Sequence, residues 1–442
     1  MNRRRLALGA AVLLVVSTGA GAMTFRAADA APGPQYFIDE AKLPFDALPG
    51  LPTDRYWGVQ SGAGYRIEVP QDWNGRLVLW AHGFRGSVSE LTVDNHPLRQ
   101  FLVANGYAWA ASSYSRNDYD VEAGVQDTHQ LLGRFNGIVG LPERVYLTGA
   151  SMGGHVTAAA IEQYRNEYDG AMPICGVLGD HKLFDFYLDY NLVSAALAGV
   201  STTFPPDPVV WTQESVPQIT GTLGAAPLGW PNGLTATGQQ LKALTELRSG
   251  GTRPLFNAAW SAWASFLFQF GALDGTVPRS PGVVVDNTDA VYQFDLDPAL
   301  SPAEQDLNNR VLRVAQEPAG RVEHGVSNVP VVNGNPRVPV LTLHDVGDLF
   351  VPFSMEQVYA SRVAANGSSQ LLVQRAIRGV GHCDFTAGEL VRGFTDLVNW
   401  VEHGVRPPGD DVTTPAVVAD PAYGCAFTTA TRALGPFTAP CP

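Results

Sequence analysis

Charged residues are scarce in this 442-residue chain, at 16% against 45% hydrophobic residues, and only three of them are lysines. So apolar a composition excludes a disordered protein, and the length allows one large or two ordinary domains with a sizeable core. The 29 basic and 42 acidic residues give a net charge of −13. Because an acidic surface repels phosphate backbones, we expect no nucleic-acid partner.

Cysteine is also rare, with four residues and neither a CxxC nor an HExxH sequence. We therefore expect no structural zinc site, no catalytic metal and no cofactor. Four cysteines allow three pairings, and the short spacing between Cys425 and Cys441 favours a disulfide between these two. Cys175 and Cys383 then remain, either as a second disulfide or as two free buried thiols.

The chain lacks an apolar run of the roughly 20 residues that a membrane-spanning helix needs. Its first residues instead combine a basic start (residues 3–5), an apolar stretch (6–17) and A-x-A patterns at 20–22 and 28–30. This layout predicts a secretory signal peptide over residues 1–30 and a soluble, secreted protein with no stable membrane anchor. The arginines leave a twin-arginine export route open.

Strand and helix patterns alternate between about residues 55 and 180, with helical spacing over 121–139 and 153–164. Such alternation predicts an α/β fold with a mostly parallel, doubly wound sheet. Continuous apolar runs such as RLVLWA are typical of strands buried on both faces. The strands expected here are 65–70, 76–81, 107–112, 144–148 and 171–177.

The alternation stops after residue 180, where proline, glycine and tryptophan become frequent. Helices are expected over 257–270 and, after the capping box at Ser301, to about residue 314. Strands return at 338–343 and 371–377, with helices over 355–365 and 387–403. We therefore predict a first core part (31–180), a mainly helical lid insertion (181–336), a second core part (337–405) and a C-terminal tail (406–442).

A G-x-S-x-G sequence, GASMG, occupies residues 149–153 between an expected strand and an expected helix. A nucleophile elbow requires this strand–turn–helix context, because the sharp turn needs small residues on both sides of the serine. The pattern predicts Ser151 as a nucleophile at the carboxyl edge of the sheet. An ordinary glycine-rich turn is the alternative.

A serine hydroxyl needs a base, and the base needs an acid that fixes its tautomer. His382 follows the last expected strand and Asp348 follows the strand before it. The order Ser151, Asp348, His382 is that of α/β-hydrolases, and all three lie at strand ends. Asp345 and Asp384 compete as the acid, and we favour Asp348 because the loop after it frees its side chain to turn toward the histidine.

An acyl-transfer site also needs N–H donors for the oxyanion. The residue after the nucleophile supplies one donor in nucleophile elbows, which predicts the backbone N–H of Met152. The loop after strand 76–81 contains HGF, and we predict the N–H of Phe84 as the second donor. The alternative is that HGF is merely a turn.

Together the sequences HGF, GASMGGH, HDVGDLFVP and GVGHCDF, in this order and each at a strand end, resemble those of secreted α/β-hydrolases of the esterase and lipase kind. The resemblance covers 55–182 and 337–404. It implies the α/β-hydrolase fold, serine-dependent hydrolysis through an acyl-enzyme, and Cys175 and Cys383 near one another at the rim of the site. Asp345 is a departure, since relatives often carry glycine after that histidine.

Aromatic residues in the insertion either line a substrate pocket or form the insertion's own core, and for 260–270 we favour the core. His155 is expected to be structural. With no basic cluster present, we predict an ester hydrolase for a neutral, moderately apolar ester, small or polymeric. Alternatives are a serine peptidase of the aminopeptidase or prolyl type on the same fold, and a non-catalytic exported binding protein. The aromatic residues are Trp211, Trp230, Trp260, Trp263, Phe266, Phe268 and Phe270.

Overall fold

The structure, a computed structural model, describes residues 35–224, 233–322, 325, 327–429 and 441–442. The predicted signal peptide (1–30) and Trp230 lie outside these residues. In the described part of the chain, no helix has both the length and the hydropathy needed to cross a membrane.

Within the described residues, eight strands form one sheet in the order β1-β2-β4-β3-β5-β6-β7-β8. The β1–β2 and β2–β4 pairs are antiparallel and all other pairs are parallel, which confirms the predicted mostly parallel sheet. The strands are β1 (Thr53–Gln60), β2 (Ala63–Pro70), β3 (Arg76–Ala81), β4 (Ala108–Ser112), β5 (Arg144–Ala150), β6 (Gly170–Ile174), β7 (Val340–Asp345) and β8 (Leu372–Ile377).

Successive side chains of a strand point to opposite faces of a sheet, and the central strands of this sheet are buried on both faces. In β3, Leu77 and Leu79 belong to one hydrophobic cluster, and Val78 and Trp80 belong to another. The first cluster includes α2 (Val121–Ile138), α3 (Met152–Gln163) and α10 (Ser354–Ala365), whereas the second includes α1 (Arg99–Ala104) and α11 (Ala387–His403). The sheet is therefore doubly wound, as predicted.

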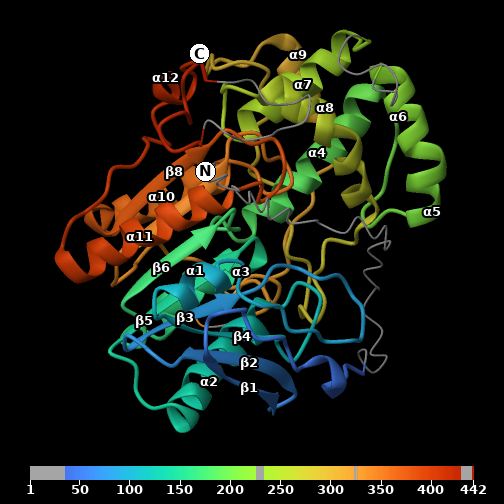
Figure 1. Cartoon of the computed structure of the whole chain (residues 1–442). Helices are drawn as coiled ribbons and strands as arrows, with labels where there is room; N and C mark the ends of the chain where they lie inside the picture. The colour runs from blue at the N-terminus through green and yellow to red at the C-terminus, as the bar shows by residue number, and fades with distance from the viewer. Residues whose placement is uncertain (1–34, 225–232, 323–324, 326, 430–440) are drawn as a thin grey trace, which may run out of the picture.

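The insertion between β6 and β7 contains helices as its regular elements in the described residues, and they gather at one end of the sheet (Figure 1). Its central helix α4 packs against α6, α7, α8 and α9. The helices are α4 (Lys182–Ala198), α5 (Pro208–Val210), η2 (Trp211–Ser215), α6 (Val216–Leu223), α7 (Ala236–Arg248), α8 (Phe256–Leu267), η3 (Phe268–Ala272) and α9 (Pro302–Arg310).

Two expected boundaries are wrong. β6 ends at Ile174 and not at 177, because Cys175 has a positive φ of 45° that no strand accommodates. The helix that begins at the Ser301 capping box ends at Arg310 and not near 314. Beyond Arg310 the chain is extended. The backbone N–H of Val314 donates to the side-chain oxygen of Asn287, and the Val314 carbonyl oxygen accepts from the Asn287 backbone N–H. A helix through Val314 would instead use that N–H for a bond within the helix.

Both predicted disulfides are present, Cys175–Cys383 and Cys425–Cys441. The first joins segments 208 residues apart and links the end of β6 to the loop after β8. The second spans 16 residues in the C-terminal tail. The alternative of free thiols at Cys175 and Cys383 is therefore wrong.

Candidate active site

Ser151 lies in the turn between β5 and α3, with φ 59° and ψ −123°. This left-handed backbone presents its hydroxyl at the carboxyl edge of the sheet. The turn requires the flanking glycines: a Cβ on Gly149 would lie 2.2 Å from the Gly153 carbonyl oxygen, and a Cβ on Gly153 would lie 2.0 Å from the Ala81 carbonyl oxygen. The local sequence thus builds a strand–turn–helix that holds one half-buried serine hydroxyl at the edge of the sheet.

The loops after β7 and β8 bring His382 and Asp348 to Ser151. His382 Nε2 lies 2.8 Å from Ser151 Oγ, and His382 Nδ1 lies 2.6 Å from Asp348 Oδ2. Because an ionised carboxylate can only accept, Nδ1 carries the proton and the Nε2 lone pair faces the serine hydroxyl. The three side chains form one continuous chain of hydrogen bonds.

The competing aspartates do not occupy the position of the acid. Asp345 is the last residue of β7, and its Oδ2 accepts a hydrogen bond from the Asp384 backbone N–H at 2.8 Å. Asp348 lies three residues further on, fully buried, and its Oδ1 accepts from the N–H groups of Phe350 and Val351 at 2.8 and 3.0 Å. Asp345 therefore ties the histidine loop to β7, while Asp348 turns its other oxygen to the imidazole.

The Cys175–Cys383 disulfide lies directly beside the imidazole, with Cys383 Sγ 3.4 Å from His382 Nε2. On another side, the Phe350 ring meets the imidazole edge-on, with ring centroids 4.9 Å apart. The potential ligand atoms of Cys175, His382 and Cys383 all lie within 4.8 Å of one another. Since the two sulfurs are bonded to each other, neither is a thiolate that could hold a metal.

The predicted oxyanion donors flank the serine. The HGF loop runs so close to it that a Cβ on Gly83 would lie 3.2 Å from Ser151 Cβ. Met152 begins α3 directly after the serine. Among the hydrogen bonds of the described residues, neither the Phe84 nor the Met152 N–H acts as a donor. Phe84 and Met152 both belong to segments that adjoin Ser151, and the role of their N–H groups toward an oxyanion stays a prediction.

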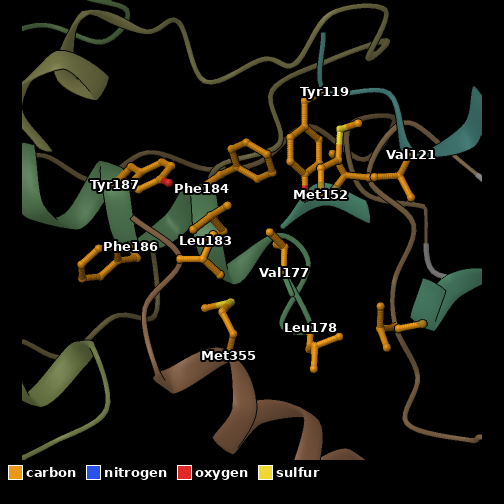
Figure 2. Packing of buried hydrophobic residues seen from close by; sticks show 14 of the residues in the cluster. Tyr119, Val121, Met152, Val177, Leu178, Leu183, Phe184, Phe186, Tyr187 and Met355 are labelled. Carbon is orange, nitrogen blue, oxygen red and sulfur yellow. The ribbon is translucent and has the colours of Figure 1, made fainter. Parts of the chain in front are cut away.

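A pocket opens beside Ser151, and the core and the insertion both contribute to its wall. Figure 2 shows Tyr119 and Phe184 next to Met152, and Tyr187 further along α4. The lining residues are Phe84, Tyr119, Ser151, Val177, Leu183, Phe184, Tyr187, Phe270, Leu273, Phe350 and Val351.

Sequence reasoning did not identify Tyr119 or Tyr187, which belong to no motif. His155 is fully buried, as expected of a structural residue, and its Nδ1 lies 2.9 Å from the Tyr119 hydroxyl. Burial lowers the pKa of His155 to about 4, so the ring is neutral near pH 7. His155 thus holds one wall of the pocket.

The insertion's aromatic residues divide between the two roles considered. Trp260 is fully buried in the insertion's core, whereas Phe270 lines the pocket. Trp263 is half-buried, and its indole N–H donates to the Val380 carbonyl oxygen at 2.7 Å, two residues before His382. Trp260 and Phe270 belong to the same buried hydrophobic cluster, as expected of a core, and Phe270 in addition lines the pocket.

No family model matches the chain. A curated relative, o-phthalyl amidase of Xanthobacter agilis, is 25% identical in an alignment of 418 positions that covers 80% of this chain and 88% of the relative. Among solved structures, feruloyl esterase B from Aspergillus oryzae is 16% identical with a TM-score of 0.47, covering 85% of this chain and 86% of its own. A second esterase from Aspergillus oryzae is 16% identical with a TM-score of 0.46, covering 80% of each chain.

The chain's own topology decides the assignment. A mostly parallel eight-stranded sheet carries a serine in a strained turn after β5, a carboxylate after β7 and a histidine after β8. This combination of sheet and strand-end residues is that of the α/β-hydrolase fold, and the chain therefore has this fold.

Proposed function

We propose that this protein is a serine hydrolase that cleaves carboxylic esters through an acyl-enzyme. The observation that carries the proposal is the hydrogen-bonded chain from Asp348 through His382 to Ser151, at 2.6 and 2.8 Å. In this arrangement Ser151 is the nucleophile, His382 the general base and acid, and Asp348 the group that orients the imidazole.

In the first half of the reaction, Ser151 Oγ attacks the acyl carbon while its proton passes to His382 Nε2. The carbonyl electron pair moves onto oxygen, and the N–H groups of Phe84 and Met152 stabilise the oxyanion. The intermediate then collapses, the bond to the leaving oxygen breaks, and that oxygen takes the proton from His382.

The second half repeats these steps with water. His382 accepts a proton from the water as its oxygen attacks the acyl-enzyme. The bond between the acyl carbon and Ser151 Oγ breaks, and Oγ recovers the proton from His382. The products are a carboxylic acid, an alcohol and the free enzyme.

Amide cleavage is the second candidate, because the curated relative is named an amidase. The same groups serve an amide if His382 protonates the departing nitrogen. A peptidase that recognises a substrate ammonium needs an acidic side chain near the serine. Among the described residues that line the pocket, none is acidic, which disfavours the aminopeptidase alternative.

We also propose that the protein is exported by way of the signal peptide predicted over residues 1–30. Disulfides persist in oxidising compartments, and this chain has two. N-terminal sequencing of protein recovered from culture medium tests the proposal. Recovery only from cytosol with the leader intact would contradict it.

The central test compares the unmodified protein, Ser151→Ala and the control Ser361→Ala, whose serine is exposed on α10. p-Nitrophenyl acetate and the matching anilide measure ester and amide cleavage, and a fluorophosphonate probe measures labelling of the serine. Ser151→Ala should lose labelling and at least about 10⁴-fold in kcat, and Ser361→Ala should lose neither. No turnover and no labelling of the folded, unmodified protein would overturn the proposal, and faster anilide cleavage would favour the amidase.

A further inference from the structure

We propose that the pocket beside Ser151 binds the acyl part of the substrate, and that this part is an uncharged aromatic group. The inference rests on the proposed function and specifies its substrate class. It depends on three features of the pocket: the chemistry of its lining, the use of its two tyrosine hydroxyls, and its place relative to His382.

The described lining is largely aromatic and carries no formal charge. Six of its residues are aromatic, four are aliphatic, and the last is Ser151. Within the described part of the chain, no lysine, arginine, histidine, aspartate or glutamate belongs to this lining. A charged substituent that entered the pocket would lose its hydration with no ion to replace it. The aromatic members are Phe84, Tyr119, Phe184, Tyr187, Phe270 and Phe350.

The Tyr119 hydroxyl is engaged outside the pocket. His155 Nε2 lies 2.7 Å from the Pro330 carbonyl oxygen, which can only accept, so Nε2 carries the proton of the neutral ring. His155 Nδ1 is then an acceptor, and it receives the Tyr119 O–H at 2.9 Å. Tyr119 therefore offers its ring, and not its hydroxyl proton, to a substrate.

The Tyr187 hydroxyl is engaged in the same way. It donates to the Phe350 carbonyl oxygen at 2.6 Å, which ties α4 to the loop that carries Asp348. With both tyrosine protons committed, Ser151 provides the hydroxyl that a substrate meets. The lining thus lacks the donors that sugars, peptides and carboxylates need for recognition.

The rings are arranged as walls that an aromatic group can join. Tyr187 and Phe270 stack with centroids 3.8 Å apart and planes 4° from parallel. Tyr119 and Phe184 meet edge to face, with centroids 5.0 Å apart. Rings prefer stacked or edge-to-face contacts with other rings, and each such pair stabilises beyond the apolar area it buries. A planar aromatic group fits this lining better than a saturated ring of similar size.

The pocket lies on the acyl side of the scissile bond. In the proposed mechanism His382 must reach the leaving atom to protonate it, so the leaving group occupies the side of Ser151 next to the imidazole. The pocket is lined by Ser151 and by Phe84, whose N–H is the proposed oxyanion donor, whereas the Phe350 ring of the lining stands between the pocket and the imidazole, 4.9 Å from it. We therefore place in the pocket the group that remains bound to Ser151 in the acyl-enzyme.

The test uses the p-nitrophenyl esters of benzoate, cyclohexanecarboxylate and 4-carboxybenzoate. The kcat/KM of each ester is divided by its rate constant for hydrolysis by hydroxide, which corrects for differences in intrinsic reactivity. We expect benzoate to exceed cyclohexanecarboxylate by about 3- to 10-fold, the value of one or two ring contacts. We expect 4-carboxybenzoate to fall about 100-fold below benzoate, because its carboxylate must enter an uncharged pocket. Equal rates for benzoate and cyclohexanecarboxylate, or for benzoate and 4-carboxybenzoate, would overturn the inference.

A change of specificity sharpens the test. Leu273→Lys places a cation at a half-buried position in the lining, and should raise the ratio of 4-carboxybenzoate to benzoate at least 10-fold. Leu312→Lys adds the same charge at an exposed position of the insertion and should leave the ratio unchanged. If Leu273→Lys does not fold, the three-ester comparison with unmodified protein still decides the question. Labelling by the fluorophosphonate with turnover of p-nitrophenyl acetate, but without the acyl preferences, would overturn this inference and leave the proposed function standing.

Discussion

The core and the insertion differ in what they bring to the same pocket. Core segments provide the polar groups arranged for chemistry: the serine after β5, the carboxylate after β7 and the histidine after β8. The insertion provides rings from α4 and η3, and no charged side chain among the described lining residues. Reactivity therefore resides in short core motifs, whereas the shape and apolarity of the pocket depend on contacts between distant segments.

The insertion also holds the loops that carry the acid and the base. Tyr187 donates to the Phe350 carbonyl oxygen, two residues after Asp348, and Trp263 donates to the Val380 carbonyl oxygen, two residues before His382. Both bonds go to backbone groups, so they fix the paths of the loops without taking part in proton transfer. The core thus carries the residues that react, and the insertion helps to position them.

The largest expected effect comes from changing the acid in the core. Asp348→Asn keeps the shape but removes the charge that fixes the imidazole tautomer, and kcat should fall about 10⁴-fold. Asp345→Asn, a change of equal size at the competing aspartate, should affect kcat far less because that side chain bonds the Asp384 backbone. Steady-state kinetics with p-nitrophenyl acetate measures both. A larger loss for Asp345→Asn would reverse the assignment.

Sequence patterns predicted the short motifs of the core, and they did not predict the contacts between the insertion and the core. Local patterns predicted β3, α11 and the elbow serine, because a continuous apolar run, amphipathic spacing and paired glycines act within a few residues. The choice between Asp345 and Asp348 was harder, since both lie at the end of the same strand and their roles depend on where β7 ends. The contacts of Tyr119, Tyr187 and Trp263 escaped prediction because their partners lie between 36 and 163 residues away.

Acid should destabilise the core. Burial lowers the pKa of His82 and His96 to about 3 and that of His155 to about 4, from 6.5, and all three lie in the core. Because the unfolded chain binds these protons more tightly, the free energy of unfolding should fall as pH drops from 6.5 toward 4. Three such groups together change the free energy of unfolding by up to about 4 kcal/mol per pH unit.

Another buried histidine opposes this trend. Burial lowers the pKa of His344, but the Glu356 carboxylate outweighs it and raises the pKa, so its contribution is lost as pH rises through the folded value. Urea denaturation at pH 7, 6, 5 and 4.5 measures the net slope. A free energy of unfolding that stays level over this range would show that the buried histidines of the core accept protons without unfolding.

The two disulfides offer a comparison between the site and the tail. Replacing Cys175 and Cys383 by serine should cost about 2–5 kcal/mol of stability, since the bridge closes a 208-residue loop. It should also lower kcat, because the bridge anchors the residue next to His382. Replacing Cys425 and Cys441 should cost less and leave kcat unchanged. Thermal unfolding and esterase kinetics test this, and an equal loss of kcat in both double variants would contradict it.

The smallest expected effect tests whether the insertion positions the histidine loop. Trp263→Phe keeps a ring against Phe350 but removes the indole N–H that reaches the Val380 carbonyl oxygen at 2.7 Å. One hydrogen bond contributes about 0.5–1.5 kcal/mol, so kcat should fall about 3- to 10-fold.

KM for p-nitrophenyl acetate should stay nearly constant in Trp263→Phe, because the acetyl group is too small to contact the aromatic residues of the pocket. The substitution changes the position of His382, and this affects kcat. Trp57→Phe, at an exposed position on β1, is the matched control and should change neither constant. A rise in KM at constant kcat would mean that Trp263 shapes the pocket and does not hold the loop. The insertion would then act in substrate binding alone, and the core would set the geometry of the base without it.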